Sequence, residues 1–493
     1  MNREESAQKT LDQYSYKYTA LVQDYDRLRW HLLTASSGIV GRIKTVFFGA
    51  ALFINQLRLD YLLSRPKLQQ ALTSQNGEEL RYQQLAHAAS YHPQFDLWDS
   101  LRLHGQKIRT FKAWEKARLQ SDFSIAAAPL QKLLKMQFSR AHDAGYDPYQ
   151  YALAEHSRGL RDSDVGQIMS DTYRSYIKLN TAKHKQSAST QVLSLPPVVL
   201  DKNTQQRIVT RLWADMGLDM ARIDVRKGAH PACLGYHDDV VLSMVYDENN
   251  VLNSFLTALH EGGHALYRQN LPRSLAGQAD GLIVGRDMDE AMALFWEHGV
   301  AHHPAFAEYL ARVIGEETHG EVALNAAALH QSIATGGSDG LRISADVMHY
   351  PLHLMQRRAV MKTLVQNGGE TEKLKHIFNA EAAGYIGAAA KYDDDGGGVL
   401  QDPHWFTGDL ADFDNYFMGQ HYALTLYQHM QPDHYAGDIK RGNFAPLAAW
   451  LNEHVYKHGA QYTSCELVEK AVGVKGAQAA NGYRQHISQI IEL

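Results

Sequence analysis

The pattern of hydrophobic and polar positions is helical over much of this chain. From residue 2 to about residue 185, apolar residues recur at helical spacing, as over residues 11–33 and 52–63, and prolines are few. No internal repeat or low-complexity linker interrupts this part. An apolar run at residues 46–54 is too short to cross a bilayer and predicts a buried helical segment. The sequence therefore predicts a mainly α-helical fold.

A Ser/Thr-rich stretch at residues 186–197 divides the chain and ends in Leu195-Pro196-Pro197. Beyond this break, Asp201 is placed to cap a helix that ends at Gly217. We expect residues 1–493 to form a single unit. Within it, the helical N-terminal part, 1–195, is a candidate lid over the part formed by 196–493.

Two short segments of a different kind follow. Residues 222–226 and 240–245 are rich in β-branched residues and bounded by turn residues, which predicts a small antiparallel hairpin. An edge strand of such a hairpin can hold an extended peptide through its backbone. The alternative, that the hairpin only packs against its surroundings, stays open at this point.

Residues 251–272 carry the strongest chemical signal of the chain. Apolar residues at helical spacing, capping groups at 247–250 and the terminating Pro272 predict a helix. Because His260 and His264 are four residues apart, both imidazoles lie on one face and can bind one tetrahedral zinc ion, with Glu261 beside them. This spacing is the HExxH motif of metallopeptidases.

The glycines inside this motif argue against a chance match, which a chain with 26 histidines could otherwise produce. Gly262 and Gly263 each cost about 1 kcal/mol relative to alanine in a helix interior. A helix that keeps both predicts the close approach of another element.

A zinc site with two histidines needs a third protein ligand and an open position. The next helical segment, residues 288–300, offers Glu290 near its start, and we expect this residue to be the ligand. The competing carboxylates are Asp287, Asp289 and Glu297. Glu297, two turns further on, is also placed to orient a histidine.

Two later stretches contain further polar chemistry. Arg342 and Asp346 stand at helical spacing, which fits either an ion pair or an anion clamp at Arg342. Residues 393–398, rich in aspartate and glycine, predict a flexible loop. His404 and Tyr416 follow this loop as hydrogen-bond donors suited to stabilising an oxyanion.

The composition limits the classes of partner. With 45% hydrophobic and 21% charged residues and a net charge of −5, the chain has the composition of a soluble globular protein, and we exclude nucleic acid and membrane as main partners. The charged N-terminus lacks the apolar core of a secretory signal. The two cysteines, Cys233 and Cys465, are too few for a disulfide framework. We therefore expect a cytoplasmic protein.

In this order, these features resemble the carboxypeptidase Taq family of metallocarboxypeptidases. The resemblance is specific from about residue 196 to residue 427 and faint before it. Glu290 follows the second histidine at the separation typical of that family. The matching stretches are His230-Pro231, Tyr246-Asp247-Glu248, His260 to Tyr267, Glu290 with Trp296-Glu297, Arg342 to Asp346, and Gln401-Asp402 with His404-Trp405.

The resemblance implies a fold, a metal and a substrate class. The fold would be a mainly α-helical saddle with a deep central groove and a small antiparallel β-sheet beside the zinc helix, usually in a homodimer. His260, His264 and Glu290 would bind zinc, with cobalt also accepted. The activity would be removal of C-terminal residues from peptide substrates.

The resemblance also assigns roles to further residues. Glu261 would be the general base that takes a proton from the attacking water. His404 and Tyr416 would stabilise the tetrahedral intermediate. Arg342 would hold the C-terminal carboxylate of the peptide, for which a guanidinium is well shaped, and His230 is assigned to substrate binding.

The chain departs from the family pattern at five positions that bear on specificity. Asp289 and Leu294 stand where the family has a histidine and an arginine beside the third ligand. Val241 and Val245 replace two arginines of the strand, and Asp412 replaces a tyrosine.

These departures leave three hypotheses for the function. The first is a zinc-dependent carboxypeptidase, and the second is a metallopeptidase or amidase of the same fold that no longer reads a free carboxylate. The third is a protein that binds metal and peptide without turnover. Glu261 argues against the third, because metal binding alone does not need a carboxylate at that position.

Overall fold

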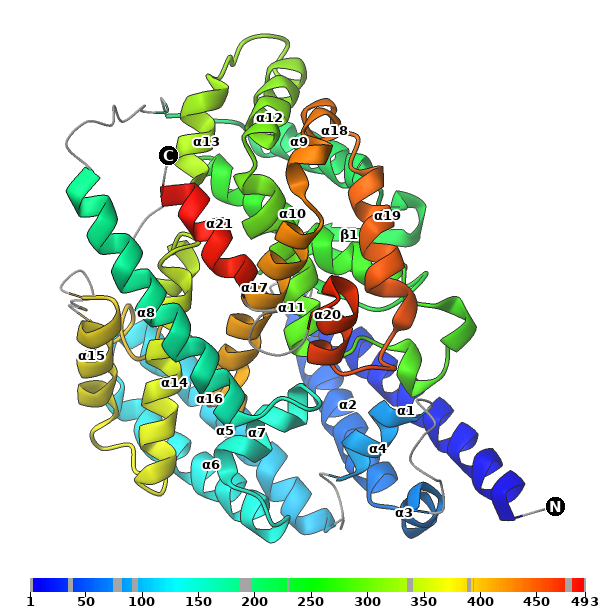
Figure 1. The fold of residues 1–493 in the computed structure, drawn as a ribbon. Helices are drawn as coiled ribbons and strands as arrows, with labels where there is room; N and C mark the ends of the chain where they lie inside the picture. The colour runs from blue at the N-terminus through cyan, green and yellow to red at the C-terminus, as the bar shows by residue number, and fades with distance from the viewer. Residues whose placement is uncertain are drawn as a thin grey trace.

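A computed structural model gives the fold, and it describes residues 3–33, 39–73, 82–90, 96–186, 195, 197–227, 230–334, 340–387, 392, 394–474 and 481–491. The described chain is mainly α-helical with one small three-stranded sheet, which confirms the predicted fold class (Figure 1). α17 lies near the centre and contacts α11, α14, α20 and α21. The divide predicted at 186–197 lies almost entirely outside the described residues.

The predicted helical N-terminal part is confirmed. Its first two helices form a pair at one side of the molecule, drawn in blue in Figure 1. The helices of this part are α1 (Arg3–Leu33), α2 (Ile39–Leu63), α3 (Pro66–Thr73), α4 (Gln83–Ser90), α5 (Leu97–Gln120), α6 (Ser124–Asp143), α7 (Pro148–His156) and α8 (Asp162–Gln186).

The apolar run at residues 46–54 lies in α2, but the prediction that it is buried is wrong for the side chains that the structure describes there. Residues 49–54 are half-buried or exposed, and the side chain of Ile54 is 54% exposed. The reason is that α2 packs mainly against one neighbour, α1, so part of its circumference faces outward. No described helix is long and apolar enough to cross a membrane.

The second part of the chain is also helical outside the sheet. Its helices are α9 (Lys202–Met216), α10 (Val251–Gln269), α11 (Arg286–Leu294), α12 (Pro304–Glu317), α13 (Ala326–Ala334), α14 (Tyr350–Gln366), α15 (Leu374–Tyr385), α16 (His404–Thr407), α17 (Asp412–His429), α18 (Ala436–Arg441), α19 (Ala445–His454), α20 (Ser464–Val472) and α21 (Asn481–Ile491).

Local capping sets the ends of the two helices predicted most sharply. The Asp201 side chain accepts hydrogen bonds from two backbone N–H groups in the first turn of α9, and Gly217 ends that helix with φ of 97°. The Asn250 side chain caps α10 by accepting one hydrogen bond, from the backbone N–H of Asn253, and that helix ends at Gln269, shortly before Pro272. Both predictions are confirmed.

The sheet corrects the predicted hairpin. Its strands are β1 (Ile223–Lys227), β2 (Ala232–Leu234) and β3 (Val240–Met244), in the order β1-β3-β2. β1 and β3 pair in parallel, with Ile223 opposite Val240, whereas β2 pairs antiparallel to β3. The antiparallel pairing predicted for 222–226 with 240–245 is wrong, because the connection forms β2 and the chain reverses direction twice.

The residues expected to form a flexible loop, 393–398, are fixed by hydrogen bonds over the part that the structure describes. From residue 394 onward the chain forms turns. The Asp395 carboxylate accepts a hydrogen bond from the backbone N–H of Phe123 at 2.9 Å, and the N–H of Gly396 donates to Ser121 Oγ at 3.1 Å. Contacts with the end of α5 and the start of α6 therefore hold this loop.

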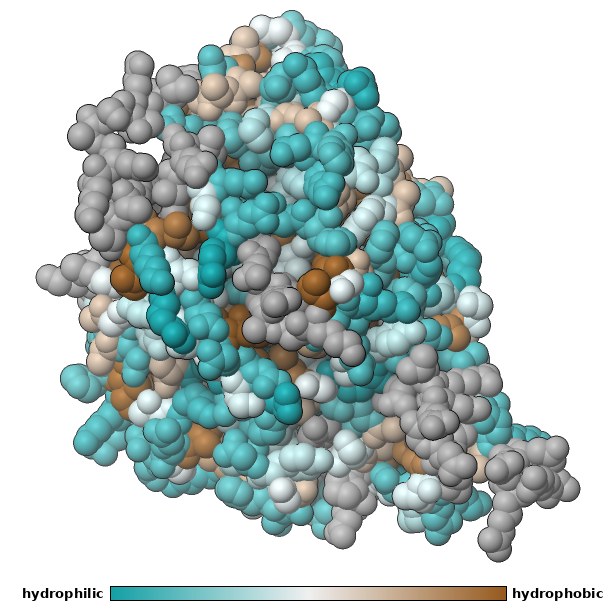
Figure 2. Space-filling view, viewed as in Figure 1, coloured by the Kyte–Doolittle hydropathy of each residue, from teal (hydrophilic) through white to brown (hydrophobic). Residues whose placement is uncertain are grey.

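The core is continuous between the two parts of the chain. Buried residues as far apart as Leu11, Leu134, Trp296 and Val468 belong to one cluster. The face drawn in Figure 2 is mostly hydrophilic, with small separate hydrophobic patches. Burial of apolar side chains in this shared core is the main contribution to the stability of the fold.

The two glycines of the HExxH stretch sit where neighbouring helices come closest. A Cβ on Gly262 would lie 2.8 Å from the Trp213 ring of α9, and a Cβ on Gly263 would lie 2.6 Å from the carbonyl oxygen of Met292 on α11. The expected close approach is confirmed on both sides. These contacts place α10 directly against α9 on one side and α11 on the other.

We expect Gly263→Ala to destabilise the protein by about 1–3 kcal/mol, because the added methyl group must displace backbone of α11. The matched control is Gly105→Ala on α5, where the nearest atom is the flexible end of Arg109 at 3.7 Å. That control should be neutral or stabilising by up to about 1 kcal/mol. Urea unfolding measures both, and equal stability of Gly263→Ala and wild type would contradict the close packing.

Several histidines are buried in the core away from the HExxH helix. Burial lowers the pKa of His353 on α14 to about 3, that of His421 on α17 to about 4 and that of His486 on α21 to about 3. Neither ring nitrogen of His353 has a hydrogen-bond partner within the described part of the chain. Folding therefore keeps these imidazoles neutral.

We expect stability to fall as the pH drops below about 6.5. In the unfolded chain these histidines are protonated near pH 6.5, whereas in the folded chain they are protonated only at about pH 3–4. Their contribution to the free energy of unfolding is therefore fully present above pH 6.5. Between these two pH values, each histidine should lower the free energy of unfolding by about 1.4 kcal/mol per pH unit. Thermal unfolding at pH 7.0, 6.0 and 5.0 measures the slope. His353→Leu should reduce it and exposed His434→Leu should not; a flat wild-type profile would refute this expectation.

Candidate metal centre

The packing of α10 on α11 brings three ligand-type side chains together. Ligand atoms of His260, His264 and Glu290 all lie within 4.8 Å of one another. The two Nε2 atoms are 3.2 Å apart, and the Glu290 carboxylate lies 3.7 Å from His260 Nε2 and 3.9 Å from His264 Nε2. We call these three residues the metal triad.

The donor set of the metal triad fits a divalent cation such as zinc. Two imidazole nitrogens and one carboxylate are the ligands of many catalytic zinc sites. Glu290 Oε2 is buried without a hydrogen-bond partner among the described residues, which is costly unless a cation binds there.

The other carboxylates considered as third ligand lie elsewhere. Asp287 accepts hydrogen bonds from Ser464 Oγ at 2.7 Å and from the backbone N–H of Met288 at 2.9 Å. Asp289 Oδ1 lies 3.2 Å from His264 Nδ1. Glu297 Oε2 lies 2.8 Å from His260 Nδ1, as its spacing predicted.

Both histidines of the metal triad therefore have a carboxylate beside Nδ1 and direct Nε2 toward Glu290. At His260 this contact is a hydrogen bond, which fixes the orientation of an imidazole ligand; at His264 it is an ion-pair contact at 3.2 Å. The helix that supplies these carboxylates continues from α11 into a π-helical turn, Phe295–Gly299, which carries Glu297. Such turns are frequent at functional sites.

The electrostatics of the centre favour a positive charge. Burial raises the pKa of Glu290 to about 6. Burial opposes protonation of His260, but Glu297, Glu290 and Glu261 outweigh it and raise the pKa of this imidazole to about 10. The protein thus concentrates carboxylates in a buried place, and a bound cation would neutralise part of their charge.

Glu261 lies in the same buried surroundings on α10. Its side chain is 7% exposed. Burial raises the pKa of its carboxyl group, while His260 and His264 act in the opposite direction. Such a carboxylate, more basic than one in water, is suited to accept a proton.

His404 and Tyr416 are brought together, and the charge of Glu290 acts on Tyr416. His404 begins α16, Tyr416 lies on α17, and His404 Nε2 is 3.3 Å from the Tyr416 hydroxyl. Burial raises the pKa of Tyr416 well above its usual value, and the carboxylates of Asp412 and Glu290 add to the effect. Burial lowers the pKa of His404. Both side chains are therefore held as neutral hydrogen-bonding groups.

Arg342 lies next to these two residues but does not form the ion pair that its spacing suggested. Its Nε and Nη2 atoms donate to Asp402 Oδ1 at 3.0 and 2.8 Å, and its guanidinium lies 5.4 Å from the ring centre of Tyr416. Asp346 instead accepts from the backbone N–H groups of Met348 and His349. The predicted pair with Asp346 fails because Arg342–Ser344 is a short 3₁₀ turn and not part of a continuous helix.

A second arginine shares the same carboxylate. Arg357 Nε donates to Asp402 Oδ2 at 2.7 Å. Arg342 and Arg357 therefore set two positive charges against the one negative charge of Asp402. Sequence reasoning missed Arg357, since its position on α14 reveals nothing about this contact.

His230 is not joined to the metal triad by any contact between described residues. It lies exposed in the bend before β2, where its carbonyl oxygen accepts a hydrogen bond from Ser243 Oγ at 2.8 Å. Its assignment to substrate binding stays a prediction.

The positions that depart from the family pattern have different surroundings. Val241 lies in β3, Val245 directly after it is 43% exposed, and Leu294 is buried in the core. Asp412 accepts a hydrogen bond from Arg286 Nη1 at 2.9 Å and lies 3.9 Å from His404 Nε2. Asp412 is thus the departure closest to the proposed donors.

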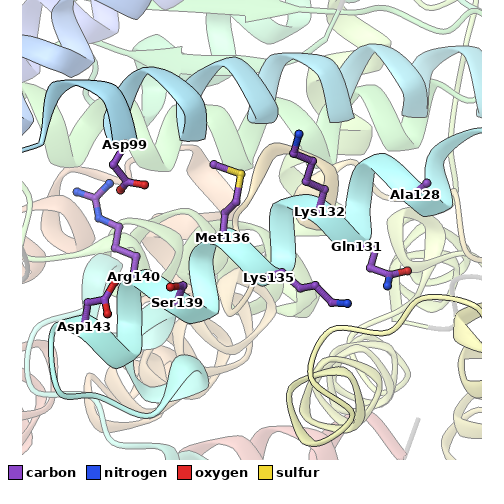
Figure 3. Close-up of a pocket in the computed structure, with 9 residues that line it drawn as sticks. All are labelled: Asp99, Ala128, Gln131, Lys132, Lys135, Met136, Ser139, Arg140 and Asp143. Atoms are coloured by element: carbon purple, nitrogen blue, oxygen red, sulfur yellow. The ribbon is translucent and has the colours of Figure 1, made fainter.

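A surface cavity of 580 Å³ between α5 and α6 does not offer comparable chemistry (Figure 3). Its charged side chains extend in different directions, as Lys132 and Lys135 show. Lys135 is paired with Glu370 at 2.7 Å, and Arg140 Nη2 lies 3.8 Å from Asp60. This cavity is therefore a polar depression of the surface rather than a convergent site.

Comparison with known proteins gives a family and a fold. The sequence profile described as carboxypeptidase Taq (M32) metallopeptidase matches residues 57–491. The carboxypeptidase 1 of Bacillus subtilis (strain 168) is 27% identical over 371 residues, 73% of each chain.

Two solved structures have the same fold. The structure of a Pyrococcus furiosus carboxypeptidase superposes with a TM-score of 0.87 at 21% identity, covering 100% of this chain and 99% of the other. Trypanosoma cruzi metallocarboxypeptidase 1 also gives a TM-score of 0.87 at 21% identity, covering 99% of this chain and 100% of the other.

Proposed function

The chain belongs to the carboxypeptidase Taq (M32) metallopeptidase family and is a metal-dependent carboxypeptidase, and from this premise we propose how its residues perform the reaction. The proposal is that His260, His264 and Glu290 bind zinc and that Glu261 is the general base. The observation that carries it is the convergence of three ligand atoms within 4.8 Å beside the buried carboxyl group of Glu261.

In this proposal the role of each group follows from the position of its side chain. A bound zinc ion supplies Lewis-acid chemistry, which polarises a carbonyl group and acidifies water. Glu261 receives the proton from the water that attacks the scissile carbonyl and then delivers it to the departing amine. Its buried position supports this role, because burial raises the proton affinity of the carboxylate.

His404 and Tyr416 are proposed to donate hydrogen bonds to the oxyanion that forms when water adds to the carbonyl. Their side chains contact each other, and the charge of Glu290 acts on Tyr416, which supports a place for this pair near the metal triad. Donors fixed in a buried site lower the energy of a developing negative charge, since they need little reorganisation.

Arg342 is proposed to bind the C-terminal carboxylate of the peptide. The cluster of Arg342, Arg357 and Asp402 keeps an excess of positive charge although Asp402 is fully engaged. Asp402 also fixes the guanidinium, which reduces the entropy lost when a ligand binds.

Replacing Arg342 should therefore affect binding more than chemistry. We expect Arg342→Met to raise KM for free-acid peptides about 10- to 100-fold, as for loss of a charged hydrogen bond, with a smaller change in kcat. Steady-state kinetics with each peptide as free acid and as amide measures the effect. The slow cleavage of the amides should stay unchanged; an equal loss for acids and amides would contradict the carboxylate role.

The proposed function is tested by mass spectrometry of a mixed peptide library after incubation with the zinc-loaded protein. Glu261→Gln and chelator-treated protein are the controls. Ladders shortened from the C-terminus, absent in both controls, are the expected result. Internal cuts, or equally fast cleavage of amidated peptides, would favour the altered metallopeptidase or amidase, and bound zinc without any cleavage would favour a binding protein.

The proposal extends to organisation and setting. We propose one peptidase unit over 1–493, which is supported by the shared core and by contacts such as Trp114 Nε1 to the Leu400 carbonyl at 3.0 Å. A homodimer, cobalt as an alternative metal and a cytoplasmic location complete the proposal. The resemblance supports the first two, and the scarcity of cysteine supports the third.

A further inference from the structure

His264 has a carboxylate beside it that the family pattern does not lead one to expect. Asp289, which stands where the family has a histidine, places Oδ1 3.2 Å from His264 Nδ1. The side chains are 12% and 10% exposed, respectively. Since Nε2 of the same ring faces His260 and Glu290, Asp289 is placed to set how His264 presents its ligand atom.

Asp289 is in turn held by an arginine of the HExxH helix. Arg268 follows His264 by one helical turn and lies on the same face of α10. Its Nε and Nη2 atoms donate to the two oxygens of Asp289 at 3.3 and 2.7 Å. This two-point contact fixes the carboxylate in rotation as well as in position.

The remaining nitrogen of Arg268 binds the N-terminal helix. Arg268 Nη1 donates to Asp26 Oδ2 on α1 and to the carbonyl oxygen of Gly235 after β2, both at 3.3 Å. The backbone N–H of Gly235 also donates to Asp26 Oδ2 at 3.2 Å. Asp26 lies before residue 57, where the match to the family profile begins.

The other histidine of the metal triad is supported differently. Glu297 contacts His260 Nδ1 at 2.8 Å, and its other ion-pair partner among the described residues is His298, at 4.0 Å. No arginine lies within ion-pair distance of Glu297 in the described part of the chain. The series of contacts from α1 through Arg268 and Asp289 therefore reaches only His264 of the two histidine ligands.

We propose that Arg268, held by Asp26, is a positioning residue for His264 that acts through Asp289, and that α1 thereby takes part in the metal centre. This inference rests on the proposed function, in that the metal triad binds the ion. If Arg268 changes, Asp289 loses its two-point anchor and His264 loses a fixed partner. Carboxylates that orient a histidine ligand in this way typically change metal affinity 10- to 100-fold when they are altered.

Zinc affinity, measured by competition with a chromophoric chelator, tests this inference. We expect Arg268→Lys and the nearly isosteric Asp26→Asn to weaken zinc binding about 10-fold or more. The matched control is Arg358→Lys, since the Arg358 side chain is only 11% exposed and also bridges two carboxylates, Asp162 and Asp414; none of its contacts with described residues involves the metal triad. The control should bind zinc as wild type does.

A double-variant cycle separates positioning from a general loss of structure. If Arg268 acts through Asp289, Arg268→Lys should cause no further loss of zinc affinity in protein that already carries Asp289→Asn. The absorption spectrum of the cobalt-loaded variants should change in Arg268→Lys and not in Arg358→Lys. The cobalt spectrum does not depend on peptide turnover.

Each outcome decides one question. Wild-type zinc affinity in both Arg268→Lys and Asp26→Asn, or additive losses in the cycle, would overturn the positioning role. Absence of stoichiometric zinc binding by wild type, with no effect of Glu290→Ala, would instead overturn the proposed metal centre itself.

Discussion

Glu261→Gln should lower kcat for peptide hydrolysis about 10²- to 10⁴-fold, the range usual for loss of a general acid–base group. Glutamine keeps the size of the side chain but cannot accept the proton of the attacking water. The substitution also removes a carboxyl group whose ionisation burial disfavours, so the folded protein should be as stable as wild type or slightly more stable.

Zinc content and KM, measured on the same preparation, test this prediction further. Zinc content and KM should stay close to the wild-type values, because Glu261 is not part of the metal triad and the amide preserves the packing. Glu453→Gln on α19, an exposed glutamate, serves as the control and should keep full activity. Activity of Glu261→Gln within tenfold of wild type would exclude Glu261 as the general base.

The second large effect concerns the third ligand. Glu290→Ala should abolish activity and weaken zinc binding at least 100-fold, because two imidazoles alone leave the ion without its carboxylate ligand. Wild-type protein should be stabilised by zinc, by about 2.7 kcal/mol when free zinc is a hundred times the dissociation constant. The variant should lose this zinc-dependent rise in Tm.

The competing carboxylate supplies the comparison for Glu290. Asp287→Asn disturbs hydrogen bonds to Ser464 and Met288, so it should lower Tm in the absence of metal, yet keep the zinc-dependent rise. Thermal unfolding with zinc and with chelator measures both variants. Loss of the rise in Asp287→Asn and its retention in Glu290→Ala would assign the ligand the other way.

The sequence also predicted where neighbouring elements pack closely against the HExxH helix. Gly262 and Gly263 carry no chemistry, but their cost in a helix indicated that other elements come close, and the structure confirms this on two sides. The positions that departed from the family pattern were harder to interpret. Asp289, a charged residue beside the third ligand, acquires a meaning only through Arg268 and His264, which come from another helix.

The outcome at Arg342 shows the same limit. Spacing along the chain suggested Asp346 as its partner, whereas the actual partner, Asp402, is distant in sequence and approaches only in the folded chain. The same limit applies to the sheet. Strand character at 240–245 was evident from β-branched residues, but whether its partner runs parallel or antiparallel depends on the path of the connection.

What the sequence determined by itself was local: the helices and their caps, the face shared by His260 and His264, and the place of Glu290 near the start of the next helix. These follow from hydrogen bonds and side-chain spacing within a few residues of one another. The tertiary structure alone decided the strand order, the pairing of Arg342 with Asp402 and the contact of Asp26 with Arg268. The strand order depends on the path of the connection, and the two ion pairs depend on which charged residues come together when distant segments pack; no local pattern encodes either.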